Sequence, residues 1–150
     1  MVNEKMKENN LANEQLAAYV GIWHTSGQIY ATDATPGVPV CGIDSYEWIP
    51  GNYFLLHKVD VMIGDSRIKN TEIIGWDYQT GNYFMHAYDT SGVFSRMQAT
   101  VNGNDWVYEG STEKFVGGFN GNGSIFSGIW YILEKDTTWR KWMEIKLEKE

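Results

Sequence analysis

The sequence predicts an all-β protein, an antiparallel up-and-down barrel of about ten strands with one short N-terminal helix capping one end. Three observations indicate this fold. Aromatic residues make up 15% of the 150 residues, and aromatic and β-branched side chains favour pleated surfaces. From Gly21 onward the apolar residues recur with a period of two, as they do in strands. Short turns rich in glycine, asparagine and proline separate the predicted strands.

The N-terminal segment precedes this pattern. Residues 1–10 are polar and carry charges of both signs, so we expect a disordered tail there. From Leu11 to Val20 the apolar residues recur at spacings of three and four, which predicts a short amphipathic helix with Asn10 as a possible N-cap. A helix this short must pack on something to be stable. We therefore expect it to plug one end of a single barrel domain formed by residues 11–150.

The predicted strands follow one another with short links. Gly81 can supply the positive φ that the hairpin loop between the two central strands needs. Because every link after the first loop is short, neighbours in sequence are expected to be neighbours in the sheet. A sandwich usually needs longer crossovers, so the barrel is favoured. The predicted strands are 22–32, 41–49, 53–63, 72–78, 82–89, 93–101, 106–110, 113–119, 124–134 and 138–149.

The net charge and the cysteine content limit the expected binding partners and the expected cellular compartment. The formal net charge is −7, which repels phosphate backbones and argues against nucleic-acid binding. Cys41 is the only cysteine, so no intramolecular disulfide forms, as is usual in a reducing cytoplasm. No signal peptide and no run of 18 apolar residues is present. We expect a cytoplasmic protein that does not enter membranes.

Several short motifs occur in an order found in known barrels. They are Gly21-Ile22-Trp23, Gly42-Ile43-Asp44, Pro50-Gly51, Gly75-Trp76-Asp77, Thr80-Gly81-Asn82-Tyr83, the turn from Asp89 to Gly92, and Trp139 at the start of the last strand. The first motif resembles the start of calycin-like barrels (lipocalins, fatty-acid-binding proteins and nitrobindins). The ordered set, between about Leu16 and Leu147, resembles the uncharacterised lipocalin-like family called DUF1579.

This resemblance implies a closed or nearly closed barrel with Trp23 closing its base, and it brings no established activity. The chain departs from the family pattern at two points. Asp44 stands where Glu is commoner, and the closing strand ends in Lys and Glu rather than Arg. With Trp23 pointing inward, strand alternation sends His24 outward.

No metal or cofactor site is predicted. The three histidines, His24, His57 and His86, lie on different predicted strands, and none has a second ligand at metal-binding spacing. A nitrobindin-like haem site would need a histidine near the end of the chain, and none follows His86. Cys41 lies in no nucleophile motif. The glycine-rich segment 117–123 lacks the phosphate-loop pattern and is interpreted as a turn.

Charged residues inside predicted strands give the sharpest functional indication. Asp44 shares a strand face with Tyr46 and Trp48, and Arg96 shares one with Phe94. These charges either face solvent or point inside, where a buried charge requires a partner, a ligand or water. The charged residues in question are Asp44, Glu47, Arg96, Lys141 and Glu144.

Alternation in the last strand bears on assembly. With Trp139 and Met143 pointing inward, Trp142 would point outward. Both faces of the strand 82–89 also carry bulky side chains. Because exposed aromatic patches often mark interfaces, we expect a homodimer.

We interpret the chain as a barrel that binds a small apolar or amphipathic molecule, such as a fatty acid, in an aromatic-lined cavity entered from the end opposite the helix. Two alternatives stay open: an enzyme that uses an internal His or carboxylate for proton transfer, and a homodimeric interaction protein without a ligand. We assign no catalytic residue and lean against an enzyme. The residues predicted to bind the ligand are Tyr46, Trp48, His57, His86, Arg96 and Met143.

Overall fold

The computed structural model describes residues 4–150, which form one α-helix and ten strands. These are α1 (Glu4–Ala17), β1 (Gly21–Ile29), β2 (Val38–Trp48), β3 (Leu55–Ile63), β4 (Ser66–Asp77), β5 (Asn82–Asp89), β6 (Phe94–Asn102), β7 (Asp105–Glu109), β8 (Glu113–Phe119), β9 (Ile125–Leu133) and β10 (Trp139–Lys149). All neighbours in sequence pair antiparallel, and β1 also pairs with β10, so the barrel is closed. The predicted fold class is confirmed.

Glycines act at two points that shape the barrel. Gly81 has a φ of 69° in the turn between β4 and β5, and its N–H donates to the Asp77 carbonyl at 2.9 Å. Gly117 on β8 pairs with Gly128 on β9, and a Cβ on either would lie 2.6 Å from Cζ of Phe115. The missing side chains therefore let the Phe115 ring cover the backbone and form part of the interior wall.

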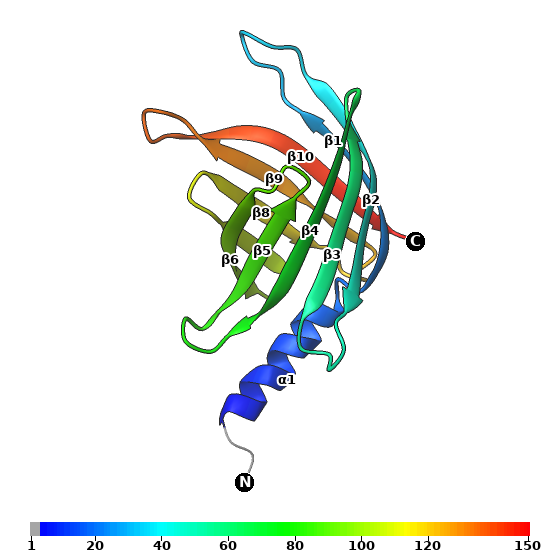
Figure 1. The fold of residues 1–150 in the computed structure, drawn as a ribbon, viewed down its shortest axis with the longest axis vertical. Helices are drawn as coiled ribbons and strands as arrows, with labels where there is room; N and C mark the ends of the chain where they lie inside the picture. The colour runs from blue at the N-terminus through cyan, green and yellow to red at the C-terminus, as the bar shows by residue number, and fades with distance from the viewer. Residues whose placement is uncertain (1–3) are drawn as a thin grey trace.

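Helix α1 closes one end of the barrel (Figure 1). Leu16 has no exposed surface, and Tyr19, which follows the helix, is 2% exposed. Trp23 lies at this closed end, where the resemblance placed it, and its Nε1–H donates to the Tyr19 carbonyl at 2.7 Å. The hydroxyls of Tyr19 and Tyr108 share a hydrogen bond of 2.6 Å. The helix, Trp23 and the aromatic side chains around them thus form a packed floor.

The helix is longer than predicted. It begins at Glu4, so the expected tail over 4–10 is helical and Asn10 is not its N-cap; residues 1–3 lie outside the described residues. The early turns are held against β4 and the turn after it, because Trp76 Nε1–H donates to the Glu8 carboxylate at 3.3 Å and the Lys5 ammonium lies 4.9 Å from the Tyr78 ring centre. This helix is neither long nor apolar enough to cross a membrane.

Strand β4 also begins earlier than predicted, at Ser66 rather than at Glu72. Its polar first half pairs with β3 throughout, and Arg67 donates two hydrogen bonds to Asp60, at 2.9 and 2.8 Å. This half is hard to recognise as a strand from hydrophobicity, because Ile68 is its only apolar residue.

The predicted alternation of β10 is wrong in its first half. The pairing with β9 shifts register between Lys141 and Met143, which marks a β-bulge. Met143 is buried as expected, but Trp142 lines the interior and Trp139 is 41% exposed. A bulge inserts one residue into the alternation, so the side chains before it are displaced to the opposite face.

Packing of the helix can be tested with a matched pair of leucines on α1. We expect Leu16→Ala to lower the free energy of unfolding by about 2–5 kcal/mol, because it opens a cavity in the floor. Leu11→Ala should change it by less than about 0.5 kcal/mol, because Leu11 is 57% exposed. Urea denaturation followed by circular dichroism measures both. Equal losses in the two variants would contradict the burial of Leu16 in the floor.

Candidate functional site

The half of the barrel remote from α1 is hollow. A cavity of about 450 Å³ occupies it. Asp89 and Val93, which lie at the turn between β5 and β6, are exposed and also line the cavity, so it opens to solvent at the end opposite the helix. Much of its wall is aliphatic or thioether: Val40, Val59, Val61, Ile63, Ile68, Met85, Ala87, Met97, Met143, Ile145 and Leu147.

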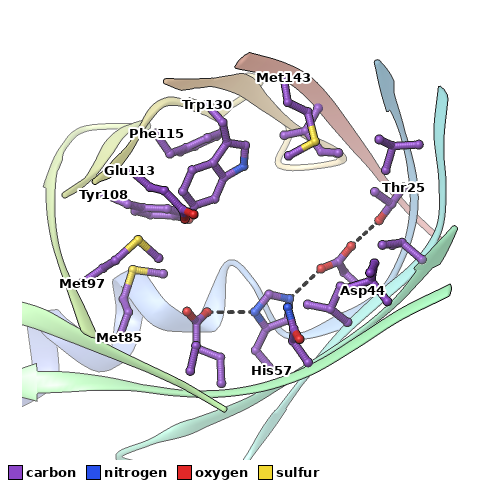
Figure 2. Close-up of a pocket in the computed structure, with 18 of the residues that line it drawn as sticks. Thr25, Asp44, His57, Met85, Met97, Tyr108, Glu113, Phe115, Trp130 and Met143 are labelled. Carbon is purple, nitrogen blue, oxygen red and sulfur yellow. Dashed lines mark hydrogen bonds and ion pairs between the residues drawn. The ribbon is translucent and has the colours of Figure 1, made fainter. Parts of the chain in front are cut away.

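One side of the wall is polar and comes from the first four strands. Thr25 Oγ1 donates to Asp44 Oδ2, and Asp44 Oδ1 lies 2.7 Å from His57 Nε2. The other ring nitrogen, Nδ1, lies 3.0 Å from Glu72 Oε1. These contacts form a continuous chain from β1 to β4, which we call the polar chain, and Figure 2 shows it along the cavity wall.

Strand register brings the polar chain together. His57 pairs directly with Tyr46 on β2 and with Glu72 on β4. Asp44 lies two residues before Tyr46, so both side chains share the inward face. Thr25 lies two residues after Trp23 on β1 and points inward for the same reason. Each member is therefore fixed by the alternation of its own strand.

His57 is a buried cation. Burial alone lowers the pKa of an imidazole, but the hydrogen bonds to Asp44 and Glu72 and the charges of these carboxylates outweigh it and raise the pKa of His57 from 6.5 to about 9. At neutral pH both ring nitrogens therefore carry protons and donate to carboxylates. The Tyr46 ring stacks on the imidazole with centres 3.9 Å apart and planes 8° from parallel, which holds the ring in place.

The two carboxylates differ in their free hydrogen-bonding capacity. Both oxygens of Asp44 are occupied, one by Thr25 and one by His57. Glu72 uses Oε1, and the described residues supply no donor to its Oε2. Every side-chain N or O atom that is fully shielded from solvent does have a partner within residues 4–150. Oε2 of Glu72 therefore borders the cavity space.

The opposite side of the cavity is aromatic and contains one further acid. Tyr108, Phe115 and Trp130 line it, and Figure 2 shows Glu113 beside them. Phe115 and Trp130 have ring centres 5.3 Å apart. Burial raises the pKa of Glu113 above its usual value. Its carboxylate has no hydrogen bond or ion pair with the described residues.

Three of the six predicted ligand-binding residues line the cavity: Tyr46, His57 and Met143. Trp48 points inward but packs into the core beside the floor, because β2 ends there. His86 and Arg96 are opposite each other on β5 and β6 and lie on the outer surface, where they border a separate shallow hollow. Their inward neighbours are Met85 and Met97, so the predicted inward placement of His86 and Arg96 is wrong.

Sequence reasoning missed Thr25, Glu72, Glu113 and Trp130 as wall residues. Glu72 had a detectable signal, since it shares a strand face with Ile74 and Trp76, where a charge is unexpected. Glu113 similarly shares a face with buried Phe115. Asp44, considered as an internal carboxylate, is internal and 7% exposed; Glu47, Lys141 and Glu144 are exposed.

The site offers no obvious metal position. In the part of the chain that the structure describes, no group of three or more His, Cys, Asp and Glu side chains is arranged to hold a metal ion. His57 in particular has both nitrogens engaged with carboxylates, which leaves none to coordinate a cation. The absence of a cofactor stays a prediction.

Comparison with known proteins supports the fold alone. No family model matches the chain, and no curated protein does. Among solved structures, the crystal structure of Rv2717c from M. tuberculosis is similar with a TM-score of 0.66 and 10% sequence identity, over 91% of this chain and 96% of that chain. Membership of the DUF1579 family stays a prediction.

The charge of His57 can be measured directly. In a His24→Gln/His86→Gln background, His57 gives the only imidazole signals, and we expect NMR titration to show a pKa near 9. The folded pKa exceeds the unfolded value, so His57 stabilises the fold fully below about pH 6.5 and loses this effect as pH rises through about 9. The loss should approach about 3 kcal/mol.

The stability difference is obtained by comparing this background with the same protein carrying His57→Gln, by urea denaturation at pH 6 and pH 10. The variant should lack the His57 part of the pH dependence. A His57 titration at or below pH 6.5 would contradict the charged polar chain, whether or not the variant folds.

Proposed function

We propose that the chain is a binding protein for a small apolar or amphipathic molecule held in the barrel cavity. The observation that carries this proposal is the division of the interior into a packed floor and an open cavity of about 450 Å³. Ligand sites in proteins are typically concave, of about 300–1,000 Å³, and mostly apolar with a few fixed polar groups. The cavity agrees with each part of that description.

The wall is suited to an apolar body of variable shape. Phe115 and Trp130 provide flat surfaces for stacking. Met85, Met97 and Met143 provide flexible, polarisable side chains that adapt to irregular ligands. The polar chain occupies one side only, so it can orient a ligand that has one polar end.

The enzymatic alternative is proton transfer by an internal histidine or carboxylate, and as a role for His57 it has less support. A general base needs a free nitrogen and a pKa near the working pH. Both nitrogens of His57 are occupied, and its pKa is raised to about 9, so the ring is charged and unable to accept a proton. The polar chain is better suited to holding a ligand than to transforming it.

Homodimer formation and a cytoplasmic location stay predictions. Trp142, one of the two features that predicted the homodimer, lines the interior. The homodimer is supported by an outer aromatic row, which lies on the outer face of the sheet. This row consists of Phe54, Phe84, His86, Phe94 and Tyr88. Light scattering over a wide concentration range tests it, and a monomer mass throughout would exclude it.

Binding can be tested with N-phenyl-1-naphthylamine, a neutral probe whose fluorescence rises in apolar surroundings. We expect about one site per chain and quenching of tryptophan emission, since Trp130 and Trp142 line the cavity. Ala87→Trp should weaken binding by about tenfold or more, a cost of about 1.4 kcal/mol, because the new ring occupies cavity space.

Tyr88→Trp is the matched control, since Tyr88 is the next residue on β5, lies in the outer aromatic row and is 45% exposed. It should bind the probe like the parent protein. The cavity proposal fails if no saturable binding occurs, or if Tyr88→Trp loses binding while Ala87→Trp keeps it. Far-UV circular dichroism verifies that both variants are folded.

A further inference from the structure

The charges on the cavity wall are unbalanced. Asp44, Glu72 and Glu113 line it, Asp89 lies at its rim, and the only cation among the lining residues is the His57 imidazolium. No Lys or Arg side chain of the described residues reaches the cavity wall. Arg96, which was predicted to bind the ligand, lies on the outer surface. A fatty acid would therefore meet a carboxylate-lined cavity without a cationic partner for its head group.

Glu72 presents a hydrogen-bond acceptor to the cavity. Its side chain is 9% exposed, its Oε1 is held by His57, and its Oε2 borders the cavity without a donor from the described residues. The single positive charge of His57 is shared between Glu72 and Asp44, so the polar chain keeps a net negative charge. A carboxylate oxygen that faces a largely apolar space is stabilised by a donor carrying positive charge.

Glu113 adds a second acidic group nearer the mouth, since it is the first residue of β8 at the open end. It has no partner of its own among the described residues, and burial disfavours its charged form. A cation in the cavity would favour the ionised carboxylate. The neighbouring aromatic side chains also attract cations through their ring faces.

We propose that the cavity binds an organic amine: a small apolar or aromatic molecule whose protonated nitrogen donates to Glu72 Oε2, with the field of Glu113 in support and the apolar body against the wall of Phe115 and Trp130. This inference rests on the proposed binding function and specifies its ligand class. Bringing an ammonium group out of water is costly, and the carboxylates offset that cost only if they remain charged and close.

Three probes with the same apolar body separate charge from hydrophobicity: 1-naphthylmethylammonium, 1-naphthalenemethanol and 1-naphthoate. Their affinities are measured at pH 7 by isothermal titration calorimetry and by competition with N-phenyl-1-naphthylamine. We expect the ammonium compound to bind about tenfold or more tightly than the alcohol, and the carboxylate about tenfold or more weakly than the alcohol.

Two variants assign the effect. Glu72→Gln removes the charge with little change in shape and should bring the ammonium and alcohol affinities to within about threefold, that is, about 0.7 kcal/mol. Glu47→Gln removes the same charge from the outer face of β2, where Glu47 is exposed, and should leave the preference intact. If Glu72→Gln does not fold, Glu113→Gln serves instead and should reduce the same preference.

The outcomes distinguish the two proposals. Equal binding of ammonium and alcohol, tighter binding of the carboxylate, or an equal loss in Glu47→Gln would overturn the amine inference and leave the binding function standing. If none of the three compounds binds and the neutral fluorescent probe does not bind either, the binding function itself fails and the amine inference fails with it.

Discussion

Pairing of β1 with β10 is the constraint on which the rest of the structure depends. The pairing runs from Trp23 opposite Lys149 to Ile29 opposite Met143 and joins the two ends of the sheet. Closure gives the sheet an inside, so each strand must send alternate side chains to the interior and to solvent. It also removes the two unpaired edges that an open sheet would expose to other chains. Both the floor and the cavity exist only because the sheet is closed.

Closure also explains how three ionised side chains can lie inside. Isolated buried charges are costly, and a buried pair remains costly unless its hydrogen bonds are satisfied. Within the barrel, the adjacent strands β1 to β4 place Thr25, Asp44, His57 and Glu72 on the inward face, so each bond joins side chains of neighbouring strands. The single exception is one Glu72 oxygen, and it is the atom that faces the cavity.

The order and approximate ends of most strands were predictable, because turn residues such as Gly81 can be recognised from the sequence by their residue type alone. The inward face was predictable where a strand has an unequivocal reference, as with Trp23 and His24. It was not predictable on β5, where Phe84 and Met85 are equally apolar and the choice of inward face depends on the whole barrel. The bulge before Met143 gave no sequence signal at all.

The partners of His57 illustrate what sequence cannot supply. Glu72 is 15 residues away and meets His57 only through the register of β3 with β4, which the early start of β4 helps to set. Asp44 was recognised as a possible internal acid that needs a partner, a ligand or water, but the histidine on the next strand was not identified as that partner. Which side chains meet inside a barrel depends on the strand register, and the register is a property of the assembled sheet.

The separation of the floor from the cavity has a consequence for how such a protein changes over generations. Leu16, Tyr19, Trp23 and Leu55, which are almost completely buried, hold the chain folded at one end. Exposed residues at the mouth, such as Val93, contribute little to that packing. Substitutions at the mouth can therefore accumulate without approaching the stability threshold that limits most proteins. Descendants of one ancestral barrel can diverge in what they hold while the floor keeps them folded.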